Sequence, residues 1–264
     1  SGVYRIPKIE SSVTAVVTNT TPVSAFRGAG RPEAAQTIER AMDMLAAALT
    51  MDPAELRRRN FIRPDAFPYL TASGASYDCG DYERALDLAL ATAGYPELRV
   101  EQARRRQEPG AKQIGIGIST YVEITNGGPE SEFGDVEIQA DGSAILRTGS
   151  FSHGQGHETT FAQIVADRLG LAVERVTVHK RDTDEIARGA GTFGSKSTQI
   201  GGAAAGQASD EVVERARSLF ADLLEANPDD IVFDRSRGEF HVAGSPDTAL
   251  DWSALAERGR LAGR

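Results

Sequence analysis

The sequence predicts an α+β fold, in which short hairpins and helices are mixed instead of alternating as a regular parallel βαβ array. Residues 133–140 and 144–149 are β-rich and flank an Asp-Gly dipeptide at 141–142, which is typical of a hairpin turn. Helical patterns follow this hairpin at 157–169 and 199–225.

The first part of the chain contains mostly helical patterns. Residues 13–18 are β-rich and predict a strand. A Pro-Glu pair then suits the first turn of a helix, which apolar residues at helical spacing extend over 33–49. Further helices are expected over 52–60 and 82–93, separated by an irregular loop at 61–80 that is rich in proline and glycine.

A charged stretch at residues 95–112 marks an expected domain boundary. Its three consecutive arginines, 104–106, have the features of a solvated helix face. The sequence character then changes from helical to strand-like. We therefore expect one domain over residues 1–110 and a second over residues 111–264.

Strand patterns recur beyond this boundary. Glycine alternates with isoleucine over 114–118, which predicts a strand with close backbone contacts on one face. Residues 173–180 alternate as a strand, and a short strand is expected over 239–242 after a turn.

Bulk composition excludes several functional classes. The chain has 264 residues, 40% of them hydrophobic, which is enough for a substantial core. Its net charge of −9 and isoelectric point near 5.1 argue against broad binding to nucleic acids or anionic membranes. No membrane-spanning run and no signal peptide are visible. The single cysteine, Cys79, favours a reducing, cytoplasmic setting.

A glycine-rich loop leads directly into an expected helix three times, at 27–33, 153–158 and 191–198. Glycine lets the backbone approach a ligand closely, and a helix N-terminus offers free N–H groups with partial positive charge. Together these features predict sites for a phosphorylated ligand, although each loop alone is also typical of a plain turn.

The third loop nearly matches the phosphate-binding loop of nucleotide hydrolases. One additional residue, Ser195, separates the last glycine from Lys196, and the stretch that precedes the loop is long. The lysine is therefore displaced by one position from the phosphate-binding pattern. This disfavours nucleotide hydrolysis, which stays open as an alternative.

Other catalytic patterns have weaker support. His153, His157 and Glu158 suggest a zinc site, but intervening glycines make one shared helix face improbable. No cysteine pair and no serine-hydrolase elbow occur in the chain. His179 and His241 are interpreted as structural, and Asp182 and Asp184 as a polar turn. No direct protein ligand to a metal is expected.

Four segments resemble the large subunits of the molybdenum hydroxylases, the family of xanthine dehydrogenase, aldehyde oxidase and carbon monoxide dehydrogenase. Residues 25–34 (AFRGAGRPEA) resemble the active-site loop of this family. Residues 154–164 (GQGHETTFAQI) and 191–198 (GTFGSKST) are similar to two cofactor loops, and 52–61 (DPAELRRRNF) also matches. The implied fold is a mixed-sheet molybdopterin-binding domain of the xanthine dehydrogenase/aldehyde oxidase type.

The resemblance implies roles for individual residues. The active-site loop beside the metal and substrate would be formed by Phe26, Arg27, Gly28 and Ala29. The implied contacts to the cofactor, largely through the backbone, are Arg27, Gly154, Gln155, Gly156, Gly194, Ser195, Lys196 and Ser197.

The resemblance also implies the cofactor and partners. Molybdenum would be held by a molybdopterin cytosine dinucleotide, and electrons would leave through iron–sulfur clusters and FAD on partner domains or subunits. The implied reaction hydroxylates an aldehyde or a heteroaromatic substrate with oxygen from water.

Two departures from the family narrow the expected substrate. Carbon monoxide dehydrogenases carry a copper-binding cysteine where this chain has Gly28, so carbon monoxide oxidation is disfavoured but kept as an alternative. Xanthine oxidases carry an aromatic residue where this chain has Ala29, so purine stacking would be lost there.

Two family motifs are missing from the sequence, an earlier Gly-Gly-Phe-Gly loop and a late Gly-x-Gly-Glu that supplies the general base. We therefore expect this chain to be the middle third of a large subunit, joining the end of one cofactor domain to the start of the next. Alone it should be inactive; a stand-alone module that binds a phosphate or cofactor is the other alternative.

Overall fold

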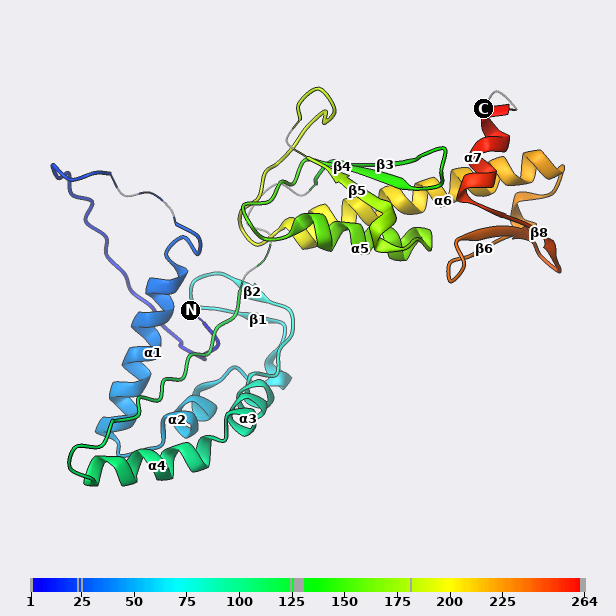
Figure 1. The fold of residues 1–264 in the computed structure, drawn as a ribbon. Coiled ribbons are helices and arrows are strands. Elements are labelled where there is room, and N and C mark those ends of the chain that lie inside the picture. Colours follow the sequence, from blue (N-terminus) through cyan, green and yellow to red (C-terminus); the bar gives the residue numbers. More distant parts are fainter. Residues whose placement is uncertain are drawn as a thin grey trace. The chain divides into compact units, whose positions relative to one another are not determined.

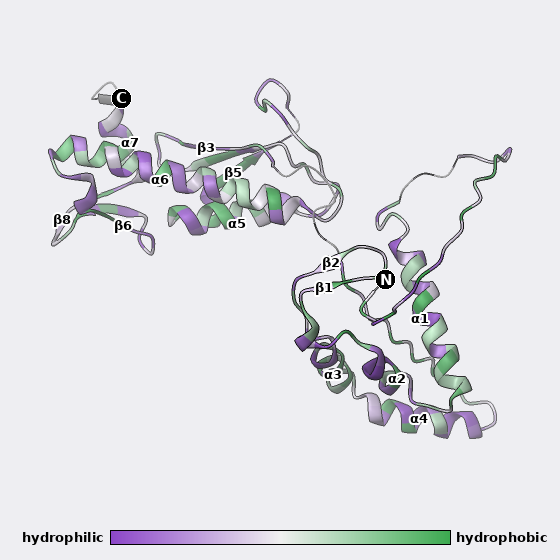
Figure 2. Cartoon of the chain, turned by 180° about the vertical axis from the view of Figure 1, so that it is seen from behind, coloured by the Kyte–Doolittle hydropathy of each residue, from purple (hydrophilic) through white to green (hydrophobic). Residues whose placement is uncertain are grey.

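The structure, a computed structural model, describes residues 2–22, 24, 26–123, 125, 131–180 and 182–261. The chain divides into two compact units, Ser1–Val122 and Glu123–Arg264 (Figure 1). The first unit thus ends later than the expected boundary at residue 110. Apolar and polar residues alternate along the longer helices, as expected for helices with one buried face (Figure 2).

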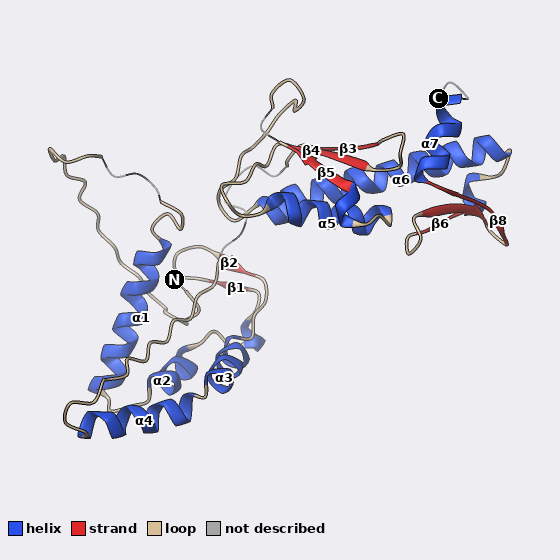
Figure 3. Cartoon of the chain, viewed as in Figure 1, coloured by secondary structure: helices blue, strands red, loops and turns tan. Residues whose placement is uncertain are grey.

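The first unit is mainly helical (Figure 3). The Asp52 carboxylate starts α2 by accepting hydrogen bonds from the backbone N–H groups of Ala54 and Glu55, at 2.8 and 3.2 Å. Gly94, with φ of 63°, ends α3 and begins α4. The elements of the unit are α1 (Arg31–Ala48), α2 (Pro53–Asn60), the 3₁₀ turn Pro64–Ala66, β1 (Tyr69–Leu70), β2 (Ser76–Tyr77), α3 (Tyr82–Ala93) and α4 (Tyr95–Gln107). The helices α1, α2 and α3 confirm the expected ones, whereas α4 lies in the charged stretch that was expected as a boundary.

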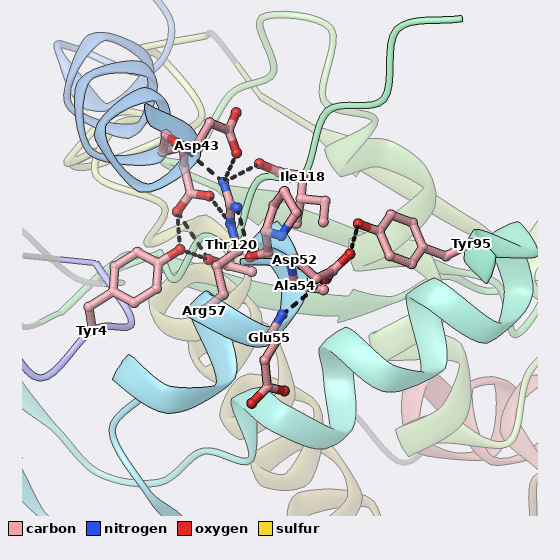
Figure 4. A network of polar contacts seen from close by, with 11 residues as sticks. Tyr4, Asp43, Asp52, Ala54, Glu55, Arg57, Tyr95, Ile118 and Thr120 are labelled. Atoms are coloured by element: carbon pink, nitrogen blue, oxygen red, sulfur yellow. Dashed lines mark hydrogen bonds and ion pairs between the residues drawn. The ribbon is translucent and has the colours of Figure 1, made fainter. Parts of the chain in front are cut away.

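A buried ion pair lies at the centre of the first unit (Figure 4). The side chain of Arg57 is fully buried and donates from Nε to the Glu39 carboxylate at 2.9 Å, and its Nη2 lies 2.9 Å from Asp43. The other Glu39 oxygen accepts from the hydroxyl of Tyr4 at 2.7 Å and from that of Thr120 at 3.0 Å. Burial raises the pKa of Tyr4, which keeps this hydroxyl protonated and able to donate.

The prediction of a strand at 114–118 is wrong, because no strand in the described part of the chain pairs with this segment. Its backbone carbonyls are bound by side chains instead: Arg57 donates to the Ile118 carbonyl at 3.0 Å, and Gln102 donates to that of Ile114 at 2.9 Å. The segment consequently lies against the helices and belongs to the first unit.

The strand expected at 13–18 is also wrong. Residues 7–22 are extended and exposed, and no strand of the described part of the chain pairs with them. High β-propensity alone does not make a strand, since each strand needs a neighbour for its backbone hydrogen bonds.

In the second unit, β3 (Gly134–Ile138) pairs antiparallel with β4 (Ala144–Thr148), which confirms the predicted hairpin. Next, β4 pairs parallel with β5 (Val176–His179), and α5 (His157–Leu169) connects them. The predicted helix at 199–225 is a π-helical turn, η3 (Ser197–Gly201), continued by α6 (Gly202–Leu224). Both helices pack on this sheet, and their contacts bury Phe161, Leu146 and Val165.

The second sheet was only partly predicted. The strand β7 (Glu239–Val242) was expected, whereas β6 (Ile231–Asp234), β8 (Ser245–Asp251) and α7 (Trp252–Leu261) were missed. Trp252 joins this sheet to α5, because its indole N–H donates to the Leu169 carbonyl at 2.7 Å and its ring packs on Phe240. Across the described residues, no helix is long and apolar enough to cross a membrane.

We predict that Arg57→Met lowers the free energy of unfolding of the first unit by about 3–5 kcal/mol, because Glu39 would remain buried without its counter-charge. Urea unfolding, followed by amide exchange in peptides from α1 and α2, measures this. The control is Arg63→Met, whose side chain is 75% exposed and pairs with the exposed Asp65. Its cost should stay below about 1 kcal/mol; equal costs for the two variants would contradict the prediction.

Candidate functional site

Two of the three glycine-rich loops meet in the second unit. The Thr192 hydroxyl donates to the carbonyl of Phe151 at 2.6 Å. The backbones also touch where Gly149 meets Gly189, since a Cβ added to Gly149 would lie 2.4 Å from the Cα of Gly189. Glycine at these two positions therefore permits a close approach that no other residue allows.

Side chains of the loop before α5 accept hydrogen bonds from the backbone of the same loop. The Ser152 hydroxyl accepts from the backbone N–H groups of Gly154 and Gly156, at 3.1 and 3.2 Å. The Gln155 side-chain oxygen accepts from the backbone N–H of His153. Gly154 and Gly156 have φ of 105° and 75°, and a Cβ on either would meet nothing within 4 Å. The loop thus leaves open space beside both glycines.

His157, the first residue of α5, is buried and stacks on Phe161 with ring centroids 5.1 Å apart. Burial lowers the pKa of His157, and the positive charges of Lys180 and His153 lower it further, against a hydrogen bond to the Ser150 backbone. Among the described residues, Nδ1 of this imidazole has no hydrogen-bond partner. His157 is therefore a neutral residue that ties the start of α5 to the start of its loop.

The loop before η3 has an unusual backbone. Gly194 and Ser195 have φ of 62° and 53°, and Lys196 returns to the right-handed region. Successive residues of opposite handedness turn their N–H groups to one side, which forms a concave site for an anion. The Ser195 hydroxyl donates to Glu123 at 2.6 Å, and that of Ser197 donates to Thr192 at 3.3 Å.

The Lys196 side chain points into the protein. The residue is 2% exposed, and its ammonium donates to the Ala190 carbonyl at 3.2 Å. The same group lies 4.1 Å from the centroid of the Phe193 ring. The lysine thus stabilises its own loop.

The remaining glycine-rich loop, before α1, belongs to the first unit. Phe26 is 86% exposed, and Arg27 and Ala29 are also exposed. Gly28 has φ of 108°, and a Cβ there would lie 2.7 Å from the Pro32 ring, so only glycine fits. Ala25, which begins the family-like motif, lies outside the described residues.

The other predicted features have simple roles. Asp182 accepts from the backbone N–H of Asp184 at 2.9 Å, in agreement with a polar turn. His153 is exposed while His157 is buried against Phe161, so the pair does not share an open face. Within the described ranges, no group of three His, Cys, Asp or Glu side chains could hold a metal ion.

The second-unit loops fit a phosphate-bearing group. Neither α5 nor η3 has a side chain that caps its N-terminus, so backbone N–H groups stay free there. The concave backbone at 194–196 adds N–H donors to this set. The open space beside Gly154 and Gly156 leaves room for a ligand, while their own N–H groups donate to Ser152. Sequence reasoning missed one buried carboxylate between the loops, Glu132, which no motif marked.

This fold and these loops define a domain that binds a phosphorylated cofactor, and comparison with known families names the class. A molybdopterin cofactor-binding domain profile matches residues 88–263, and a second such profile matches residues 1–61. The chain belongs to the molybdopterin cofactor-binding domain family, which confirms the resemblance found in its motifs.

Individual relatives carry the names of enzymes that act on different substrates. The carbon monoxide dehydrogenase large chain of Hydrogenophaga pseudoflava is 41% identical, with 92% of this chain and 32% of the relative covered. The nicotine 6-hydroxylase large subunit of Paenarthrobacter nicotinovorans is 33% identical, with 97% of this chain and 32% of the relative covered.

A solved structure agrees with this assignment. Quinoline 2-oxidoreductase from Pseudomonas putida 86 superposes with a TM-score of 0.86 at 32% identity, with 99% of this chain and 34% of the other covered. The chain thus spans about a third of the length of the relatives it matches.

We predict that the second unit loses stability in acid through His157. Its folded-state pKa lies below the ordinary value near 6.5, so the unfolded chain binds a proton first as the pH falls. Stability is therefore full above about pH 6.5 and declines below it, towards the lower folded-state pKa. Urea unfolding at pH 7.5 and 5.5 should show a smaller acid loss in His157→Gln.

The control for this prediction is His241→Gln, at a half-exposed position in β7. It should keep the acid sensitivity of the parent chain. An unchanged acid loss in His157→Gln would show that other groups cause it.

Proposed function

We propose that this chain forms the cofactor-binding part of a molybdenum-dependent hydroxylase that acts on an aldehyde or a heteroaromatic substrate. One observation carries the proposal: in a chain of the molybdopterin-binding family, two uncapped helix N-termini and their glycine-rich loops lie side by side. The bound cofactor would supply the redox chemistry that adds water-derived oxygen to the substrate.

The residues divide into a cofactor set and a substrate set. Backbone N–H groups would bind the phosphate and pterin, and the exposed Arg27 and Phe26 would lie on the substrate side. The proposed cofactor contacts are Arg27, Gly154, Gln155, Gly156, Gly194, Ser195, Lys196 and Ser197. Because the ammonium of Lys196 is buried and donates to the Ala190 carbonyl, we expect this residue to contact the cofactor through its backbone.

The active-site loop favours hydroxylation over carbon monoxide oxidation. The relatives include enzymes named for both chemistries, so similarity alone does not separate them. Gly28 has no side chain for a copper ligand, and its contact with Pro32 excludes one in this loop conformation. Ala29 is small and offers no ring on which a purine could stack.

Larger assignments follow from the family. The cofactor would be the cytosine dinucleotide form, with iron–sulfur and FAD domains or subunits as electron acceptors. Several relatives carry names of subunits or large chains, which supports a multi-subunit assembly. We assign the first unit to the end of one cofactor domain and the second unit to the start of the next, in a cytoplasmic enzyme.

The buried lysine also argues against nucleotide hydrolysis. A phosphate-binding loop needs its lysine ammonium at the phosphates. Here the Lys196 ammonium is bound by Ala190 and Phe193 and is 2% exposed.

The test replaces a loop glycine by a larger residue in the complete large subunit. Gly154→Leu should reduce the bound pterin, measured by fluorescence after oxidative release, roughly tenfold, because its side chain would fill the open cofactor space. Gly244→Leu is a matched control, since Gly244 also has positive φ and no atom within 4 Å of a Cβ. It should retain the pterin of the parent.

Two results would contradict the proposal. A parent subunit without bound pterin would exclude the cofactor, and unchanged pterin in Gly154→Leu would exclude this loop. The 264-residue chain alone should show no hydroxylation of aldehydes or N-heterocycles; turnover by it would contradict its assignment as one part of the site.

A further inference from the structure

Glu132 is a buried carboxylate that bonds to both cofactor loops. It is 7% exposed and precedes β3. Its Oε2 accepts from the Ser150 hydroxyl at 3.0 Å, and its Oε1 accepts from the Ala190 backbone N–H at 3.1 Å. Ser150 lies in the loop between β4 and α5, and Ala190 lies in the loop between β5 and η3, just before its glycine-rich part. One side chain therefore links the two loops.

Lys196 also binds Ala190, through the backbone carbonyl of that residue. The Ala190 N–H donates to the Glu132 carboxylate, and the Ala190 carbonyl accepts from the Lys196 ammonium. Two buried groups of opposite charge thus bind the two ends of one residue. Within the described ranges, no carboxylate lies within ion-pair distance of Lys196.

Electrostatics makes this arrangement costly to disturb. A buried charge without compensation costs several kcal/mol, so each of these groups needs an opposite charge or hydrogen bonds. Each charge is compensated by a hydrogen bond to a different peptide group of Ala190, so both hydrogen bonds hold the same short segment. Loss of either charge should therefore loosen the loop that contains residue 190.

We propose that Glu132 is a positioning residue for the cofactor site: it holds the loop at 188–197 against the loop at 149–156, so that both sets of backbone N–H groups face one ligand. This inference rests on the proposed function for its ligand. The role of Glu132 in joining the loops is testable without that ligand.

The first experiment measures amide exchange by mass spectrometry in the 264-residue chain without cofactor. In Glu132→Gln, peptides from 149–156 and 188–197 should exchange about tenfold faster, as loss of a charged hydrogen bond predicts. Exchange in peptides from α6 and from β6–β8 should stay unchanged, which separates loop positioning from general destabilisation. The matched control is Glu174→Gln, an exposed glutamate before β5, and it should exchange like the parent.

A double-mutant cycle tests the coupling through Ala190. Lys196→Met alone should also speed amide exchange in the loop at 188–197. In the double variant with Glu132→Gln, the loss of protection should be smaller than the sum of the losses in the two single variants. Additive effects would overturn the coupling. Unchanged loop exchange in Glu132→Gln would overturn the positioning role itself.

The second experiment measures pterin bound to the complete large subunit. Glu132→Gln should lower it several-fold per folded protein, and Glu174→Gln should not. Full pterin content despite faster loop exchange would overturn the role towards the cofactor. A parent subunit without pterin would instead refute the proposed function, while the exchange result would still decide whether Glu132 joins the loops.

Discussion

Both units depend on the same constraint, which is that a charge removed from water must be compensated where it is buried. In the first unit the guanidinium of Arg57 binds the Glu39 carboxylate directly, and its other nitrogens bind the Asp43 carboxylate and backbone carbonyls. In the second unit Glu132 and Lys196 are compensated through the peptide groups of Ala190. In both, the compensation holds an irregular segment that no sheet or helix would otherwise fix.

The parts of the fold that were predictable depend on local chemistry. The Asp-Gly turn at 141–142 specifies the β3–β4 hairpin, and the Asp52 carboxylate specifies the start of α2. The segments at 13–18 and 114–118 have strand-like composition, but no strand among the described residues pairs with either of them. Pairing depends on residues far away in the sequence, so composition alone could not reveal that it was absent.

The residues of the candidate site also fall into two groups, those that the local sequence predicts and those that depend on tertiary contacts. Its glycines could be found from the sequence, because positive φ and close backbone approach restrict the local residue type. Glu132 could not, because its partners Ser150 and Ala190 lie 18 and 58 positions away. The inward direction of Lys196 also depends on tertiary packing, and the motif by itself suggested an ordinary phosphate-binding lysine.

The position of Trp252 has a practical consequence. It is the single tryptophan of the chain and lies buried in the aromatic cluster of the second unit, whereas all six tyrosines precede residue 123. Each unit therefore carries its own chromophore. Tryptophan emission reports the unfolding of the second unit alone, and tyrosine absorbance reports the unfolding of the first unit. One sample can therefore reveal whether the two units unfold together.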